Sequence, residues 1–261
     1  MNIINIIDDY LTTESDYKMK SHHPSGADNC SRQMWYKWQQ APVTNPPEAG
    51  AFWKMEIGNA IHELVFDLMK KAGMDKVEQE IVVKEEIEGL KYPISGRMDN
   101  TFIDENGETC GLEIKTSFGR GIVSIQKSQE PKPEHLTQIG FYLTYTDIKK
   151  FYLVYIGRDN AYRCQFVVTL EDGVMTYNEK KKPWVIGTYI KKFSRVENAT
   201  SEPAREYKIA IKGGEIKDKF QKDKVEYKSS WQCQYCQYKD HCWKDVLEKA
   251  KIGEWHGDKT V

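Results

Sequence analysis

An Asn-Gly dipeptide set between two apolar runs restricts the fold of this chain more than any other feature. The runs at 91–104 and 109–117 flank it, and Asn-Gly in such a setting predicts a β-hairpin with two paired strands. Residues two positions apart on a strand share a face of the sheet. The hairpin therefore predicts that Asp99 of the first strand meets Glu113 and Lys115 of the second on one patch of the sheet.

Helices and strands are both expected around this hairpin. Apolar residues recur at helical spacing from Ala51 to Lys71, and Gly73 follows as a stop. The other expected elements are a helix at 28–39 with Asp28 or Asn29 as its N-cap, strands at 79–87, 150–157 and 162–170, a helix at 133–147, and a mostly helical stretch at 171–195 that Pro183 interrupts or starts. This order predicts an α/β fold with a central mixed β-sheet flanked by helices.

Composition limits the class of protein. The chain has 261 residues, of which 39% are apolar and 30% charged, and its formal net charge is −1, which is ordinary for a globular protein. No apolar run approaches the roughly 18 residues that a membrane-spanning helix needs, and the acidic N-terminus does not resemble a signal peptide. We therefore expect a cytoplasmic protein with no membrane partner.

Residues 208–228 are locally basic, with seven lysines against four acidic residues. Such a run is typical of a solvated surface, and it can also contact phosphates. Both interpretations stay open, since the net charge of the whole chain does not by itself indicate a nucleic-acid partner.

Asp99 and Glu113 would repel each other on one patch of sheet unless a cation lay between them. Mg²⁺ and Mn²⁺ favour oxygen ligands such as carboxylates, and Lys115 could orient a water or stabilise charge on a phosphate. A salt-bridged pair on a solvated strand face is the alternative interpretation. The residues alone leave both open.

The spacing of these residues resembles the signature of the PD-(D/E)XK nuclease superfamily. Thirteen residues separate Asp99 from the triplet Glu113-Ile114-Lys115. On the preceding helix, His62 in "GNAIH" is similar to a metal-binding histidine of the RecB-like branch of this superfamily. Met98 precedes Asp99 where the name of the superfamily has proline; the proline is often absent from the family, so this is a small departure.

A second helix carries Gln138 and Tyr142 in "QIGFY", four positions apart and hence on one face. The pair resembles the Q-x-x-x-Y motif of the RecB-like branch, which lines the active site. The resemblance implies metal ligation by His62, Asp99, Glu113 and the Ile114 carbonyl, catalysis by Lys115 together with Glu113, Asp99, Gln138 and Tyr142, and a more peripheral role for Glu80.

The C-terminal region holds a cluster of three cysteines, Cys233, Cys236 and Cys242, with the spacing C-x2-C-x5-C. Thiols this close together in a cytosolic chain favour metal binding over disulfides. Cys30 is a candidate fourth ligand, and four cysteines suit either Zn²⁺ or a [4Fe–4S] cluster. His241 is an alternative ligand for zinc.

One cysteine before the core and three after it resemble the iron–sulfur staple of RecB-like nucleases, among them the AddB nuclease domain and the CRISPR-associated RecB-like exonucleases. The resemblance implies a [4Fe–4S] cluster that clasps the two terminal segments together, held by Cys30, Cys233, Cys236 and Cys242. Cys110 and Cys164 lie in strand-like surroundings, and we expect them in the core.

The expected organisation is an N-terminal helical segment at 1–50, a restriction-endonuclease-like core at 51–195, a lysine-rich linker or arm at 196–228 and the cysteine segment at 229–261. The resemblance implies a Mg²⁺- or Mn²⁺-dependent deoxyribonuclease of a prokaryotic or phage-infected cell. It would be an exonuclease on DNA ends or single strands, acting in recombination, repair, phage DNA processing or CRISPR adaptation, with a helicase or recombination protein as partner. Two alternatives stay open: a zinc-stapled site-specific endonuclease, and a catalytically idle DNA-binding recombination partner.

Overall fold

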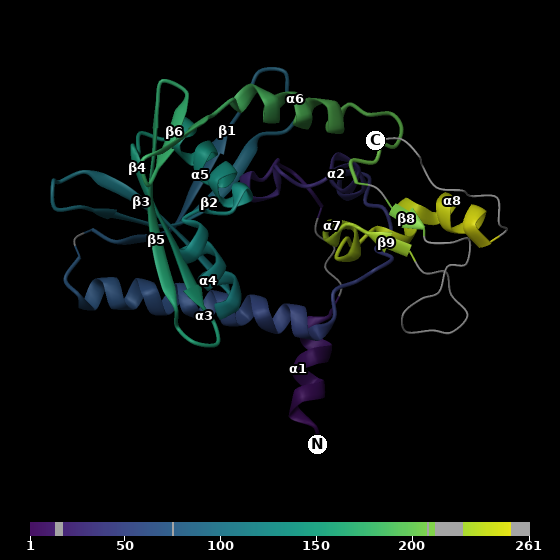
Figure 1. The fold of residues 1–261 in the computed structure, drawn as a ribbon, viewed down its shortest axis with the longest axis horizontal. Helices are drawn as coiled ribbons and strands as arrows, with labels where there is room; N and C mark the ends of the chain where they lie inside the picture. Colours follow the sequence, from purple (N-terminus) through teal and green to yellow (C-terminus); the bar gives the residue numbers. More distant parts are fainter. Residues whose placement is uncertain (14–17, 75, 208, 212–226, 252–261) are drawn as a thin grey trace. The chain divides into compact units, whose positions relative to one another are not determined.

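We describe the fold from a computed structural model of the chain, in residues 1–13, 18–74, 76–207, 209–211 and 227–251 (Figure 1). The chain divides into two compact units, and each draws on segments that lie far apart in the sequence. The first consists of Met1–Met19, Asn29–Gly50 and Val196–Val261, and the second of Lys20–Asp28 and Ala51–Arg195. The second unit carries a seven-stranded sheet.

The strands of this sheet follow chain order. They are β1 (Glu78–Glu85), β2 (Ile94–Ile103), β3 (Thr109–Ser117), β4 (Lys150–Gly157), β5 (Arg163–Glu171), β6 (Val174–Tyr177) and β7 (Lys180–Pro183). Neighbours are antiparallel except β3 and β4, which run parallel. A parallel pair needs a crossover connection, and here it consists of α4 (Gly119–Ser128) and α5 (Pro133–Tyr145). The predicted mixed sheet flanked by helices is therefore confirmed.

The helices cover both faces of the sheet. α4 and α5 pack on one face, in an apolar cluster around Leu153. The long helix α3 (Ala49–Lys71) packs on the other, where Met69 lies against a cluster that contains Ile114. Because side chains alternate along a strand, Glu113 of β3 points to the α5 side. This alternation sets the two directions from which side chains reach the candidate site.

The stretch 171–195 is only half helical. A hairpin of β6 and β7 occupies its first half, with positive φ angles at Gly173 in one turn and at Asn178 and Glu179 in the next, and α6 (Ile186–Glu197) follows. The prediction of mostly helix was wrong because Asp-Gly before an alternating run is a hairpin signal. The segment before α5, which gave no clear pattern, contains α4.

The helix expected at 28–39 is α2 (Ser31–Trp38), and its N-cap is Cys30. The expectation that Asp28 or Asn29 caps it was wrong. No neighbouring side chain caps α2; instead Glu206 Oε1 accepts the Ser31 N–H at 3.0 Å and also the Ser31 hydroxyl. A carboxylate from a distant segment thus satisfies the N-terminus of this helix.

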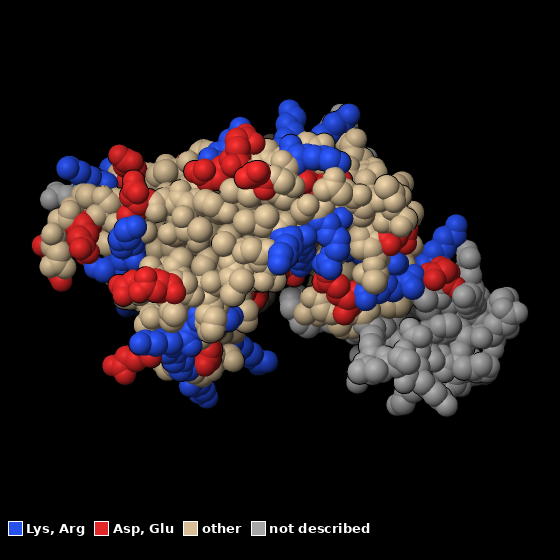
Figure 2. Space-filling view, turned by 90° about the horizontal axis from the view of Figure 1, so that it is seen from above, with Lys and Arg blue, Asp and Glu red and all other residues tan. Residues whose placement is uncertain are grey.

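The remaining elements are α1 (Ile3–Leu11), η1 (Pro24–Gly26), β8 (Ile209–Ile211), β9 (Tyr227–Ser229), α7 (Trp231–Gln234) and α8 (Lys239–Lys251). Among the described helices, none has both the length and the apolar character that crossing a membrane requires. On the face drawn in Figure 2, basic and acidic side chains are interspersed. Most of the lysine-rich run at 208–228, and so its contact with phosphates, lies outside the described residues.

Candidate active site

β2 and β3 separate where the sequence predicts a site. Their pairing ends at Asn100 opposite Leu112. The residue before Asn100 is Asp99, and its Oδ2 accepts the N–H of Ile114 at 2.6 Å. The carboxylate therefore takes the place of a backbone carbonyl in the ladder, and it lies in the opening between the two strands.

The alternation of side chains along β2 is also interrupted at this point. Met98 packs in the cluster on the α5 side, whereas Phe102 packs in the cluster on the α3 side. Strict alternation would put both on one face. On the neighbouring strand, Glu80 has φ +59°, the β1–β2 pairing skips Glu80 and Asp99, and the Glu80 carboxylate pairs with Arg97. The break lets groups from both faces of the sheet reach Asp99.

α3 brings His62 to Asp99. Gly58 is the buried residue of this helix, and it lies against β3. A Cβ on Gly58 would be only 3.2 Å from Thr116 Oγ1 of that strand. One turn later, His62 Nδ1 lies 3.4 Å from Asp99 Oδ1. Burial disfavours the charged imidazole, but the hydrogen bond to Asp99 and the charges of Asp99 and Glu113 outweigh it and raise the pKa of His62.

Glu113 is enclosed, with 1% of its surface exposed. Its Oε1 lies 2.6 Å from Lys115 Nζ, and its Oε2 is buried without a hydrogen-bond partner. Burial raises the pKa of Glu113 to about 7. The positive charge of Lys115 lowers this pKa, and the negative charge of Asp99 raises it. An unpartnered buried carboxylate oxygen costs on the order of 1–3 kcal/mol or more, which indicates a position where a further group binds.

The predicted pair on α5 completes the arrangement. Lys115 Nζ donates to Gln138 Oε1 at 2.9 Å, Gln138 Nε2 donates to the Tyr142 hydroxyl at 3.1 Å, and Tyr142 donates to the carbonyl of Arg97 at 2.9 Å. Gly96 makes room for this ring, since a Cβ there would be 2.9 Å from the Tyr142 hydroxyl. Burial, followed by the charge of Glu113, raises the pKa of Tyr142, so the hydroxyl stays a donor.

These contacts bring together the side chains of His62, Asp99, Glu113, Lys115, Gln138 and Tyr142. Ile114 takes part through its N–H. Within the described part of the chain, no three His, Cys, Asp or Glu side chains stand at the spacing of a finished metal site. The arrangement is thus a cluster of candidate ligands. One carboxylate oxygen of Glu113 is paired with Lys115, and one carboxylate oxygen of Asp99 is paired with His62.

His135 lies beside this cluster, and it belongs to no motif that we recognised in the sequence. Its Nδ1 is 2.9 Å from the Tyr155 hydroxyl, which also accepts the N–H of Lys132 at 3.0 Å. Burial, followed by the charges of Lys115 and Lys132, lowers the pKa of His135 to about 3. The parallel register of β3 and β4 sets Tyr155, the partner of His135, beside Lys115, and it thereby brings His135 close to the cluster. Such a register cannot be read from the sequence.

The cysteines predicted as ligands, Cys30, Cys233, Cys236 and Cys242, all belong to the first unit. All six cysteines of the chain are free thiols. Burial is the main cause of the raised pKa of Cys233 and Cys236, and the charges of Cys30 and Cys242 add to it for both. Cys30 and Cys242 thus lie within electrostatic reach of Cys233 and Cys236, but among the described residues the four thiols do not stand as a group that could hold a metal ion. The remaining two, which we expected in the core, lie on strands of the sheet: Cys110 is buried, whereas Cys164 is only partly buried against the core.

Aromatic residues around these thiols mostly fill a small core. Tyr36, Tyr238 and Trp243 are buried, whereas Tyr235 is 80% exposed. The Tyr36 ring has its centroid 5.3 Å from that of Tyr238 and 4.9 Å from that of His241. Packing thus accounts for the buried rings.

No family model matches the chain, and no curated protein sequence matches it significantly. Among solved structures, the crystal structure of SSO0001 is similar with a TM-score of 0.55 and 17% identity, over 90% of this chain and 93% of that one. An alkaline exonuclease, LHK-Exo from Laribacter hongkongensis, gives a TM-score of 0.45 at 14% identity over 69% of this chain and 87% of that one. Its complex with dAMP gives 0.42 at 13% over 74% and 90%. At such identities, the likeness to SSO0001 is one of fold alone.

Proposed function

We propose that the chain is a DNA nuclease that depends on a divalent metal ion. The observation that carries the proposal is the meeting of Asp99, Glu113 and Lys115 where β2 and β3 separate, with one buried oxygen of Glu113 unpartnered. When His62 is neutral, the form in which imidazole binds a metal, two carboxylates stand there against one ammonium group, so a cation would balance the local charge. The same residues carry the resemblance to the PD-(D/E)XK superfamily.

The chemistry of these residues fits Mg²⁺ or Mn²⁺. Both ions take carboxylate and carbonyl oxygens, and Mn²⁺ also accepts imidazole. The ligands would come from His62, Asp99, the free oxygen of Glu113 and the Ile114 carbonyl. A bound ion would polarise the phosphate and acidify a water molecule.

Lys115 supplies a fixed positive charge beside these ligands. Its ammonium group is held from two sides, by Glu113 and by Gln138. In this position it would orient the attacking water or stabilise the negative charge that develops on phosphorus. Gln138 and Tyr142 act as positioning residues, since they fix Lys115 through a chain of hydrogen bonds.

The substrate we propose is DNA, with ends or single strands preferred. The support for this preference is the resemblance of His62, Gln138 and Tyr142 to the RecB-like branch. A site-specific endonuclease would instead cut closed circles at internal positions, and an idle recombination partner would bind DNA without cutting it.

Digestion of end-labelled single strands, linear duplex and closed circles, with Mn²⁺, Mg²⁺ or EDTA, tests the proposal. We expect metal-dependent loss of single strands or linear DNA. Glu113→Gln should slow cleavage by about 100-fold or more, whereas Glu88→Gln, which changes an exposed acid beyond β1, should not. Undiminished cleavage by Glu113→Gln would overturn the site, and DNA binding without cleavage under all conditions would favour the idle partner.

We further propose that Cys30, Cys233, Cys236 and Cys242 hold a [4Fe–4S] cluster. The support is that these four thiols are free, lie in one unit and influence one another electrostatically. Four thiolates are the usual ligands of such a cluster. It would join α2 to the segment of α7 and α8 and close a very long loop, where a cross-link restricts the unfolded chain most.

Iron and acid-labile sulfide analysis of anaerobically purified protein, with its visible absorption spectrum, tests the cluster. Cys30→Ser should lose the iron and the visible band. Cys164→Ser, a thiol of β5, is the matched control and should keep both. Colourless protein with stoichiometric zinc would replace the cluster by the zinc alternative, and His241→Gln would then show whether the imidazole is a ligand.

A further inference from the structure

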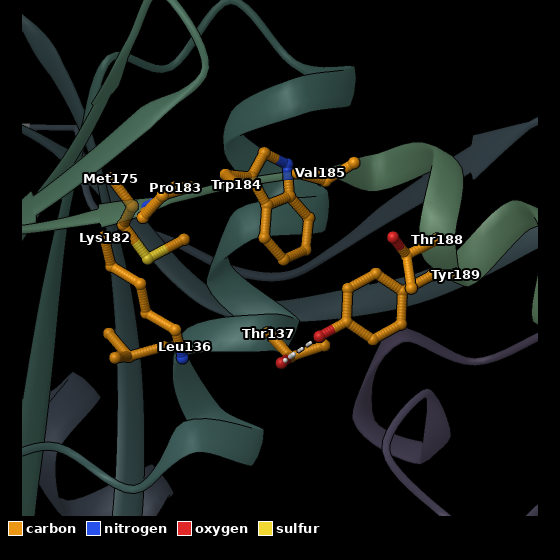
Figure 3. Close-up of a pocket in the computed structure, with 9 residues that line it drawn as sticks. All are labelled: Leu136, Thr137, Met175, Lys182, Pro183, Trp184, Val185, Thr188 and Tyr189. Carbon is orange, nitrogen blue, oxygen red and sulfur yellow. Dashed lines mark hydrogen bonds between the residues drawn. The ribbon is translucent and has the colours of Figure 1, made fainter.

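A pocket lies next to the candidate active site, on another face of the same helix. α5, β6, β7 and α6 form it (Figure 3). Thr137 of α5 lines the pocket, and the next residue, Gln138, contacts Lys115. A helix with its side chains is about 10 Å across, so on the order of one helix diameter separates the pocket from the ammonium group of Lys115.

Two stacked aromatic rings make one wall of the pocket. The rings of Trp184 and Tyr189 lie with their centroids 5.3 Å apart at an interplanar angle of 27°. Trp184 Nε1 donates to Thr144 Oγ1 at 2.8 Å, and the Tyr189 hydroxyl lies 3.0 Å from Thr137 Oγ1. Hydrogen bonds to α5 thus hold both rings before any ligand arrives. A fixed aromatic stack is the surface on which an unpaired nucleobase binds.

A cation lines the opposite side. Figure 3 shows Lys182 of β7 across the pocket from Trp184 and Tyr189, and this lysine is exposed. The cavity measures about 160 Å³, well below the roughly 300 Å³ at which pockets for drug-sized ligands begin. Its size therefore fits one planar base, with the adjoining phosphate outside and within reach of Lys182.

We propose that this pocket holds one unstacked base of the DNA strand that the active site cleaves. The proposal rests on the nuclease function above and specifies its substrate, because a base can enter only where the strand is unpaired. A stacked strand advances about 3.4 Å per nucleotide, so the bound base lies within about three nucleotides of the scissile phosphate. Lys182 binds the phosphate next to it.

Photocrosslinking tests the base contact directly. The probe is a single-stranded oligonucleotide with 5-iododeoxyuridine at successive positions, bound to full-length Glu113→Gln protein with Mn²⁺. We expect one position, near the end that occupies the active site, to crosslink to Trp184 or Tyr189 in peptide mapping. Crosslinks only to other residues, or no binding of the oligonucleotide at all, would overturn the proposal.

A matched pair of lysine variants tests the phosphate contact. Lys182→Glu should weaken binding of the same oligonucleotide about fivefold to tenfold and lower the salt slope of binding by about one. Lys181→Glu changes the neighbouring residue on β7, which points to the other face, and should change neither. Equal effects of the two variants would overturn the pocket and leave the nuclease function standing. If the wild type cuts no DNA but the crosslink forms, the nuclease proposal fails and the base pocket stands.

Discussion

Lys115 Nζ and Gln138 Oε1 are joined by a hydrogen bond of 2.9 Å between β3 and α5. Together with the 2.6 Å contact to Glu113 Oε1, it holds the ammonium group from two elements of secondary structure. Gln138 is itself fixed, because its amide donates to Tyr142. The direction of the lysine charge therefore depends on a glutamine that need not touch the substrate.

Gln138→Leu should slow cleavage by about 100-fold with little change in DNA binding, because a misplaced catalytic group loses rate rather than affinity. Tyr142→Phe removes only the far end of the chain of hydrogen bonds and should lose less. Single-turnover cleavage at saturating Mn²⁺ measures both. Gln126→Leu is the control, since Gln126 lies on α4 and donates to the carbonyl of Arg163. A Gln138→Leu rate equal to the wild type would refute the positioning role.

His135 makes the fold sensitive to acid. Its pKa in the folded chain is about 3 against an ordinary value of 6.5. Between these two values the unfolded chain binds a proton that the folded chain does not, so the free energy of unfolding falls as the pH drops through this range. His135→Gln, which can still hydrogen-bond to Tyr155 but does not titrate, should lose less stability on acidification.

Urea unfolding at about pH 7 and about pH 5 in EDTA measures this difference. The midpoint of the wild type should fall more than that of His135→Gln. Parallel shifts of the two proteins would mean that other groups cause the acid sensitivity. EDTA is needed because metal binding at the neighbouring carboxylates depends on pH as well.

The sequence predicted the hairpin and the meeting of Asp99 with Glu113 and Lys115, because turn chemistry and strand alternation are local properties. Gly107 indeed has φ +79° in that turn. The sequence did not predict that β2 changes face at Asp99. The pairing of β1 with β2 skips Asp99 together with Glu80, whose φ is positive, and no local pattern indicates such a φ for a glutamate.

Other misses have the same origin. α2 is capped by Glu206, and a residue so far along the chain cannot be recognised as a cap before the fold is known. His135 reaches the site only through the β3–β4 register. The strand β6 was within reach of sequence reasoning, since the turn before it is Asp172-Gly173.

Gly111 of β3 leaves room for the buried ring of Phe151. A Cβ on Gly111 would stand 2.3 Å from Phe151 Cζ, and the two residues are direct partners in the parallel ladder. Gly111→Ala should therefore destabilise the fold by about 1–3 kcal/mol, because the ring must move within a packed core. Gly187→Ala on α6 meets nothing within 4 Å and should be neutral or stabilise by up to about 1 kcal/mol. Equal thermal midpoints for the two variants would contradict this account.

Glu206 stabilises the helix that begins beside Cys30. Its carboxylate accepts the Ser31 N–H at 3.0 Å and the Ser31 hydroxyl, so it caps α2 and places negative charge at the helix N-terminus. Glu206→Ala should lower the free energy of unfolding by about 1 kcal/mol or somewhat more. Glu206→Gln keeps an acceptor but loses the charge and should cost roughly 0.3–1 kcal/mol. Asp9→Ala on exposed α1 is the control, and thermal unfolding measures all three. Because a frayed first turn would displace Cys30, a ligand of the proposed [4Fe–4S] cluster, Glu206→Ala should also lose the iron of that proposed cluster faster under chelator than Glu206→Gln. Equal rates of iron loss in the two variants would mean that capping of α2 by Glu206 does not affect how firmly iron is held.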